Sequence, residues 1–338
     1  MDACFLVSPE KMNEPQSLCR VWLNTGCSSG FGLALGSAVL ARGQRVIATA
    51  RQPSALGDLA ARFPETCRVL ALDVTNSLQV KSVLAQAADA FGRLDVVVNN
   101  AGYGLVGAFE ELGAEQIARN FETNFFGALE VIRAALPILR AQGSGHIVNI
   151  SAAAVISNYA AFSIYGATKW ALEGVSESLA AELKPLGIKV TIVQPGPFRT
   201  DFIGRSIERA EGHIADYDRT SGKFLRFLET MDGKQPGDPA RAAEAIIAAW
   251  NPTLRRCASC SANTRTTSCA RSWRMRSANA LRGSRLDCPQ ISLPLDETLQ
   301  DAHRPRHHPD HRGGGLLALQ HFPRGHRDAG LQSDPHRG

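Results

Sequence analysis

The sequence of 338 residues lacks any apolar run long enough to cross a bilayer. Its first residues, MDACFLVSPE, also lack the basic start and the continuous apolar stretch of an export signal. The eight cysteines show no regular spacing of the kind that small secreted domains use for disulfides. These absences argue against a membrane-spanning or disulfide-stapled chain, and they predict a cytoplasmic protein with free thiols.

Lysine is missing from the last 85 residues, which hold 14 Arg and seven Asp or Glu. The rest of the chain carries 23 basic and 25 acidic residues, so the formal net charge of +5 belongs to this tail. A basic balance favours nucleic-acid or membrane partners. Because the charge is confined to one segment, we expect neither partner for the protein as a whole.

Short β-branched runs alternate with longer segments of helical period between residues 20 and 250. This pattern is typical of an α/β fold with a doubly wound parallel sheet between two layers of helices. Helices are predicted near 30–42, 76–91, 113–141 and 163–184, and another starts at Asp238 and Pro239. Six strands are evident, at 20–24, 45–49, 68–72, 94–99, 146–150 and 189–194. The last strand usual in such a sheet is expected to be missing or altered.

Composition divides the chain into three parts. Residues 1–19 are expected to form an N-terminal extension, and residues 20–253 a single α/β domain in which the polar stretch 200–237 is a lid over the binding site. The Arg-, His- and Cys-rich tail 254–338 has no helical or strand period. Three interpretations stay open: a disordered basic arm, a zinc site that uses Cys257 and Cys260, or a segment translated out of frame.

A glycine-rich loop follows the first strand and precedes a helix. Glycines at this place allow a tight turn and a close approach of the backbone to a pyrophosphate, which then lies at the positive end of the helix. At the end of the second strand stands Arg51, where an NAD site usually has a carboxylate. A guanidinium can bind a 2′-phosphate through two hydrogen bonds, so NADP(H) is favoured, with NAD(H) as the alternative. The loop residues are Thr25, Gly26, Cys27, Ser28, Ser29, Gly30, Phe31 and Gly32.

Tyr165 and Lys169 are four residues apart in a predicted helix, so both side chains emerge on one face. An ammonium group beside a phenol favours the phenolate and lowers the phenol pKa from about 10. Such a tyrosine exchanges a proton with a carbonyl or a carbinol near neutral pH. Beside a nicotinamide site, the pair predicts general acid/base catalysis.

Together, these motifs resemble the short-chain dehydrogenase/reductase (SDR) family over roughly residues 20–250. The order of six motifs carries the resemblance: the glycine loop, Asp73 in LDVT, the run Asn99-Asn100-Ala101-Gly102, Asn124, Tyr165 with Lys169, and Pro195-Gly196 with Thr200. The resemblance implies a Rossmann-type fold, a small-molecule carbonyl or alcohol substrate, and a homodimer or homotetramer built through 113–141 and 163–184. The aromatic and apolar residues Tyr159, Phe162, Ile164 and Phe202 suggest a hydrophobic substrate, and they are equally compatible with a core position.

The resemblance also implies roles for single residues. Lys169 binds the nicotinamide ribose as well as assisting Tyr165, and Asn124 helps to hold a water in a proton relay. Asp73 and Val74 contact the adenine, and Asn100, Ala101 and Gly102 line the cofactor. The segment after the sixth strand flanks the carboxamide through Pro195, Gly196, Phe198 and Thr200. Hydride transfer itself is the chemistry of the cofactor.

One position departs from the family pattern. The family usually has a catalytic serine 13 residues before the tyrosine, and this chain has Ala152 there, with Ser151 one position earlier. Adjacent strand residues point to opposite faces, so Ser151 needs a local twist to present its hydroxyl to a substrate. We expect an NADP(H)-dependent alcohol dehydrogenase or carbonyl reductase that uses Tyr165, Lys169 and Asn124. Either its activity is reduced, or Ser151, with Ser157 as the alternative, replaces the missing serine. The alternative is an NADP(H)-binding protein without catalysis.

Overall fold

A computed structural model describes residues 19–250 and 273–277 of the chain. The predicted N-terminal extension, apart from Cys19, lies outside the described residues. The same holds for the tail from residue 254, apart from 273–277, and therefore for Cys257, Cys260 and the three interpretations of that segment.

A central sheet with the strand order β3-β2-β1-β4-β6-β7-β9 dominates the described part. The first six strands of this order are parallel to one another, and β9 (Trp273–Ser277) pairs antiparallel to β7 at the edge. All six predicted strands form, which confirms the doubly wound fold class. Their bounds are β1 Val21–Asn24, β2 Arg45–Ala50, β3 Cys67–Ala71, β4 Val96–Asn99, β6 Gly145–Ile150 and β7 Ile188–Pro195.

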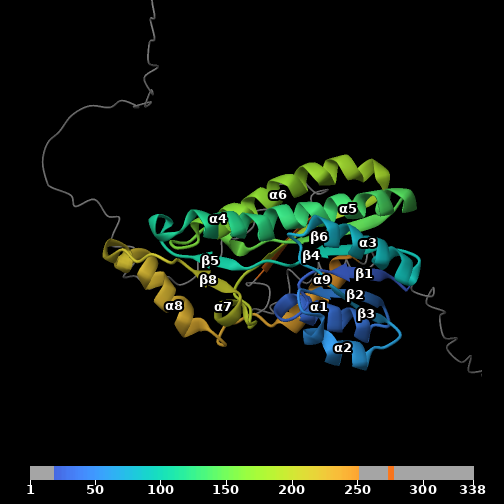
Figure 1. Ribbon diagram of the computed structural model, residues 1–338, viewed down its shortest axis with the longest axis horizontal. Coiled ribbons are helices and arrows are strands. Elements are labelled where there is room, and N and C mark those ends of the chain that lie inside the picture. Colours follow the sequence, from blue (N-terminus) through green and yellow to red (C-terminus); the bar gives the residue numbers. More distant parts are fainter. Residues whose placement is uncertain (1–18, 251–272, 278–338) are drawn as a thin grey trace, which may run out of the picture. The chain divides into compact units, whose positions relative to one another are not determined.

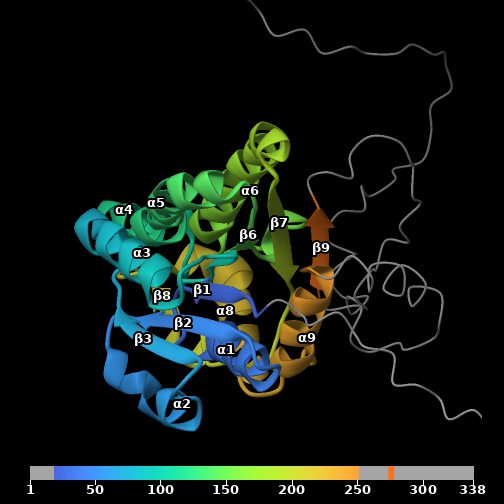
Figure 2. The same cartoon turned by 90° about the vertical axis from the view of Figure 1, so that its right-hand side faces the viewer.

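Helices cover both faces of the sheet, as Figure 2 shows. Alternate residues of one strand enter different cores: Val21 and Leu23 pack on one side, and Trp22 packs on the other. This two-sided burial explains why the strands are apolar runs rather than alternating ones. Among the described residues, no helix is long and apolar enough to span a membrane. One face carries α1 (Gly30–Ala41), α2 (Gly57–Arg62) and α9 (Pro239–Trp250), and the other α3 (Ser77–Phe91), α5 (Gly127–Gln142) and α6 (Ser163–Leu183).

The long helix predicted over 113–141 is interrupted. It consists of α4 (Ala114–Phe121), a π-helical turn (Glu122–Phe126) and α5. The side chain of Asn124, inside this turn, hydrogen-bonds to both backbone groups of Tyr103, with its Oδ1 2.9 Å from the Tyr103 nitrogen and its Nδ2 2.8 Å from the Tyr103 oxygen. This long-range contact lies on the π turn, a distortion that is frequent at functional sites.

A small second sheet, which the sequence did not predict, pairs β5 (Gly104–Val106) with β8 (Ile207–Arg209) in parallel. Three-residue strands are too short to show a period. The predicted lid segment, residues 200–237, contains β8, α7 (Phe202–Arg205) and α8 (Lys223–Met231). Figure 1 shows β5, β8 and α8 at one end of the main sheet.

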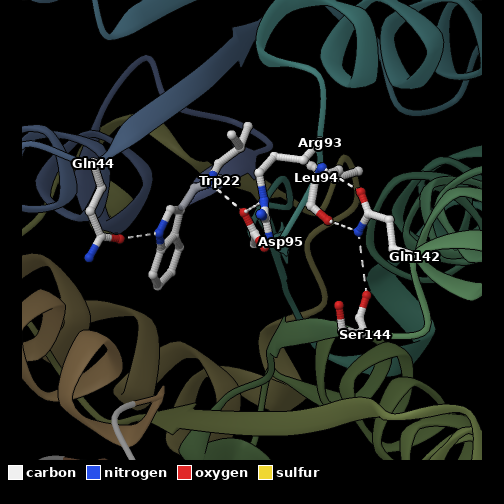
Figure 3. A network of polar contacts seen from close by, with 8 residues as sticks. Trp22, Gln44, Arg93, Leu94, Asp95, Gln142 and Ser144 are labelled. Atoms are coloured by element: carbon white, nitrogen blue, oxygen red, sulfur yellow. Dashed lines mark hydrogen bonds and ion pairs between the residues drawn. The ribbon is translucent and has the colours of Figure 1, made fainter. Parts of the chain in front are cut away.

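A polar network closes the opposite end, where β1 and β4 begin (Figure 3). The Asp95 carboxylate accepts hydrogen bonds from the Val21 backbone nitrogen at 2.9 Å and from the Arg93 guanidinium at 2.5 and 2.8 Å. Beside it, the Gln142 side chain bonds to both backbone groups of Leu94. These contacts fix β1, β4 and the end of α5 to one another.

Candidate functional site

The glycine loop between β1 and α1 lies at the carboxyl end of the parallel strands, which is where open α/β sheets bind ligands. Gly26 and Gly30 adopt positive φ angles of 68° and 56°. A Cβ on Gly26 would lie 2.9 Å from the Ala101 Cα, and one on Gly32 only 2.3 Å from the Gly26 oxygen. The backbone of the loop therefore packs too tightly for other residues at these positions.

The side chains of Thr25 and Asn100 fix the conformation of this loop through hydrogen bonds. The buried Thr25 hydroxyl donates to the Val98 oxygen and accepts from the backbone nitrogens of Asn100 and Ala101, both at 3.0 Å. The Asn100 Nδ2 donates to the oxygens of Thr25 and Gly26. The structure thus gives both side chains a supporting function in the loop, in addition to the predicted place beside the cofactor.

The loop fits a pyrophosphate. The half-buried hydroxyls of Ser28 and Ser29 have no hydrogen-bond partner within the described residues, although Ser29 precedes α1 in the position of a cap. The first turn of α1 contains no acidic residue. Free hydroxyls beside the positive end of a helix suit an anion, and the tight cradle of Gly26 and Gly32 allows a close approach.

Arg51 and Asp73 stand at the ends of β2 and β3, beside the glycine loop in the sheet order. Arg51 is exposed and has no ion-pair partner among the described residues. One carboxylate oxygen of Asp73 accepts from the nitrogen and hydroxyl of Thr75, which leaves its other oxygen for a ligand. Val74 is buried in the core and touches the position of Gly127. The sequence predicts that Arg51, Asp73 and Val74 contact the adenosine half of a dinucleotide, and all three lie shortly after the end of β2 or β3.

Tyr165 and Lys169 lie on the first turns of α6, and both are buried. The Lys169 Nζ lies 5.9 Å from the centre of the Tyr165 ring and donates to the Ile150 oxygen at 2.9 Å. Burial raises the pKa of Tyr165 above its usual value and lowers that of Lys169 to about 8. This direction is opposite to the predicted lowering of the tyrosine pKa, because burial disfavours the phenolate.

Asn124 and Gly102 complete this part of the site. A Cβ on Gly102 would lie 2.8 Å from the Asn124 Oδ1 and 3.5 Å from the Lys169 Nζ. The Asn124 Nδ2 also lies 3.3 Å from the Thr168 hydroxyl. Residues from three separate sequence motifs thus converge around the lysine.

The segment after β7 closes against the start of α1. The rings of Phe198 and Phe31 are in edge contact, with centroids 4.9 Å apart, and a Cβ on Gly30 would lie 3.5 Å from the Thr200 Cβ. Pro195, the last residue of β7, and Gly196, which follows it, are half-buried. The sites predicted from the glycine loop and from the proline motif are therefore neighbours in space.

Comparison with known proteins agrees with this geometry. The family model described as short chain dehydrogenase matches residues 20–211. The chain belongs to the short-chain dehydrogenase family. It is 37% identical to a 3-ketodihydrosphingosine reductase from Bacteroides thetaiotaomicron over 70% of this chain and 86% of the relative.

Two solved structures of family members are also similar to the chain. A short-chain dehydrogenase from Streptomyces avermitilis is 44% identical, with a TM-score of 0.64 over 69% of this chain and 85% of the other. A member from Burkholderia phymatum, solved in complex with NAD, is 25% identical, with a TM-score of 0.62 over 68% of this chain and 85% of the other. The protein is thus an oxidoreductase of the short-chain dehydrogenase family, whose members bind nicotinamide dinucleotides.

Ser151 is the serine nearest to the position where the family usually has its catalytic serine, and its hydroxyl is bonded to another residue. The Ser151 hydroxyl donates to the Glu173 carboxylate at 2.5 Å, on the side where α6 packs against the strands. Ala152 instead belongs to the apolar cluster that contains Tyr165. The twist that Ser151 would need to face a substrate is absent from this region, and a methyl group takes the place next to the tyrosine.

Sequence reasoning missed Glu173 and Gln194. Glu173 is buried on α6, and both of its oxygens accept from the Gln194 Nε2 at 2.8 Å. A glutamate four residues after Lys169, on the same helix face, was the available signal. Of the apolar residues near the tyrosine, Phe162 and Phe202 pack with Tyr165, whereas Ile164 lies in another cluster and Tyr159 is 41% exposed.

Proposed function

We propose that the protein is an NADP(H)-dependent oxidoreductase that interconverts a ketone or aldehyde and the corresponding alcohol. The observation that carries this proposal is the buried pair of Tyr165 and Lys169, with the lysine fixed on the Ile150 oxygen and beside Gly102 and Asn124. The name of the Bacteroides relative, a ketone reductase, supports a carbonyl substrate.

Tyr165 acts as the general acid in reduction. Because burial raises its pKa, the phenol carries its proton at neutral pH and donates it from Oη to the carbonyl oxygen. Lys169, whose Nζ lies 5.9 Å from the centre of the Tyr165 ring, would stabilise negative charge that develops on the phenol oxygen. A reduced nicotinamide, when bound, would supply the hydride for the carbonyl carbon. In oxidation, the proton returns to Tyr165.

Phe162, Phe202 and Phe224 form the apolar surface around Tyr165. Two of these rings come from the lid segment, so the reacting carbonyl would be shielded from water when the segment lies over the site. This surface supports a hydrophobic substrate, and it supports the proposal that residues 200–237 act as a lid.

Arg51 favours NADP(H) over NAD(H). The residues Ala50-Arg51-Gln52 at the end of β2 contain no carboxylate for the ribose hydroxyls, and the exposed guanidinium is available for a 2′-phosphate. Replacement Arg51→Ala should raise the KM for NADPH about tenfold, which corresponds to one charge-assisted hydrogen-bonded contact, and leave that for NADH unchanged. Arg140→Ala, which removes an exposed arginine at the end of α5, serves as the matched control.

The activity itself is tested by NADPH oxidation with a panel of aliphatic and aromatic ketones. We expect turnover by the unmodified protein and a loss of about 10²- to 10⁴-fold in kcat for Tyr165→Phe, which keeps the ring and removes the proton donor. Equal activity of the two proteins would overturn the role of Tyr165.

A second candidate function is favoured by one observation, the methyl group of Ala152 beside Tyr165. In this alternative, the protein binds NADP(H) without reducing a carbonyl. Tight NADPH binding together with no turnover of any ketone in the panel would favour this alternative.

We further propose a homodimer or homotetramer assembled through α5 and α6. Trp170, directly after Lys169 on α6, is 58% exposed, and Phe126, just before α5, is 46% exposed. Large exposed aromatics of this kind favour a protein interface. Trp170→Glu should shift the mass measured by sedimentation toward that of the monomer.

A further inference from the structure

A pocket of about 480 Å³ lies beside the apolar surface of Tyr165, between the end of β5, the segment before α6 and the lid segment. This volume is in the range of small-molecule sites. Phe109 and Tyr159 contribute apolar surface to it. Its polar wall is formed by Glu110, Ser163, Tyr217 and Ser221.

A row of aromatic rings connects this pocket with Tyr165. Tyr165 packs on Phe162 with ring centroids 5.2 Å apart, and Phe162 packs on Phe224 at 5.3 Å. Phe224 in turn stacks on Tyr159 at 5.2 Å, with the two planes only 8° from parallel. Because Tyr159 lines the pocket, a row of packed rings, in which Phe162 and Tyr165 are buried, connects the proposed proton donor with the pocket.

The polar wall contains groups without partners. The Ser163 hydroxyl is buried and makes no hydrogen bond, although buried polar groups usually find a partner. The Glu110 Oε2 accepts from the Tyr217 hydroxyl at 2.8 Å, while its Oε1 has no partner within the described part of the chain. A carboxylate oxygen and a hydroxyl are thus available to a ligand that donates hydrogen bonds.

Charge at the pocket is negative. No basic side chain is among its lining residues. The hydrogen bond to Glu110 and the charges of Glu110, Asp216 and Glu111 raise the pKa of Tyr217 above its usual value, because they disfavour a phenolate there. A cationic group is therefore favoured over an anionic one.

We propose that this pocket is a distal subsite for an ammonium group of the substrate. The carbonyl then lies at Tyr165, an apolar chain lies along the aromatic row, and the ammonium group binds Glu110 and Ser163. The inference deepens the proposed function, because it assigns the substrate to the class of long-chain amino ketones.

Kinetics with matched ketones test the subsite. Straight-chain methyl ketones of increasing length are compared in two forms, with a terminal ammonium group and with a terminal methyl group. We expect the ammonium form to have the lower KM at one chain length, and Glu110→Gln to raise that KM about tenfold, as loss of one charged contact predicts. The methyl form should be unaffected. Glu115→Gln, an exposed glutamate on α4 outside the pocket, is the matched control.

A binding measurement separates this inference from the proposed function. Calorimetry with a straight-chain alkylamine below its micelle concentration should show binding that Glu110→Gln or Ser163→Ala weakens, whereas the alcohol of equal length should bind more weakly. That result supports the subsite whether or not ketones are reduced. Equal binding of amine and alcohol, or an amine affinity unchanged by Glu110→Gln, would overturn it. Absence of ketone turnover would count against the proposed function alone.

Discussion

At the scale of single residues, Ala152 and Lys169 show how burial sets the chemistry next to Tyr165. Ala152 packs in the cluster of the tyrosine and offers no hydrogen bond to a carbonyl oxygen. Lys169 is buried in the same region, where loss of hydration destabilises its charged form. Each residue leads to a prediction.

Replacement Ala152→Ser should increase kcat for ketone reduction by up to about 10²- to 10³-fold, because a second donor would polarise the carbonyl beside Tyr165. Steady-state kinetics with NADPH and a ketone measure this gain. Ala153→Ser adds the same hydroxyl at the next, half-buried position and should leave kcat unchanged. If Ala152→Ser binds NADPH normally and its kcat does not rise, a missing donor is not what limits the reaction.

Replacement Lys169→Met should stabilise the protein near neutral pH. Burial lowers the lysine pKa from 10.5 to about 8, so the charged form is disfavoured in the folded state. Below pH 8 this costs roughly 3 kcal/mol of stability, and the cost disappears as pH rises from 8 to 10.5. The variant also loses the hydrogen bond to the Ile150 oxygen. We therefore expect its free energy of unfolding to rise by about 2 kcal/mol in total.

Urea unfolding of Lys169→Met near neutral pH and near pH 10 measures this gain and its decline. Lys184→Met removes an exposed lysine and should change the free energy of unfolding by less than about 0.5 kcal/mol. A gain that is equal at both pH values would contradict the assigned cause. NADPH affinity should fall in Lys169→Met but not in Lys184→Met.

At the scale of elements, α6 is the piece that unites the site with the sheet. Its first turns carry Tyr165 and Lys169, and one turn later Glu173 binds Ser151 at the end of β6 and Gln194 in β7. This arrangement fixes the Ile150 oxygen on which Lys169 rests, since Ile150 directly precedes Ser151.

Replacement Glu173→Gln should loosen this junction locally, because an amide has one acceptor oxygen instead of two and leaves a buried donor unpaired. The Ser151 amide, which donates to the Val193 oxygen at 2.7 Å, should exchange its hydrogen about tenfold faster, as expected for a loss of about 1.4 kcal/mol. Hydrogen exchange measured by mass spectrometry or NMR tests this. The exposed Glu177→Gln on the same helix is the control, and equal exchange in both variants would refute the junction.

At the scale of the whole described molecule, the two halves of the sheet meet where β1 pairs with β4. Only three residue pairs are in register there, from Trp22–Val96 to Asn24–Val98. The Asp95 carboxylate lengthens this junction by binding the Val21 nitrogen, and Arg93 compensates its charge. One buried side chain therefore adds to the backbone pairing at this junction.

Replacement Asp95→Ala should lower the free energy of global unfolding by about 2–3 kcal/mol, since it leaves the Val21 nitrogen and the partly exposed Arg93 without their acceptor. Denaturant unfolding followed by circular dichroism measures the loss. Asp89→Ala on the exposed face of α3 should change stability by less than about 0.5 kcal/mol. Similar values for both variants would show that the network contributes little.

The six parallel strands, the glycine loop and the spacing of Tyr165 and Lys169 follow from local sequence patterns. Period, β-branched runs and positive-φ glycines are local properties, so they are visible before folding. Three features emerge only in the folded chain: the Ser151 hydroxyl bonds to Glu173, β5 pairs with β8, and burial raises the pKa of Tyr165. These features depend on solvent exclusion and on contacts between residues far apart in the chain, which no local pattern contains.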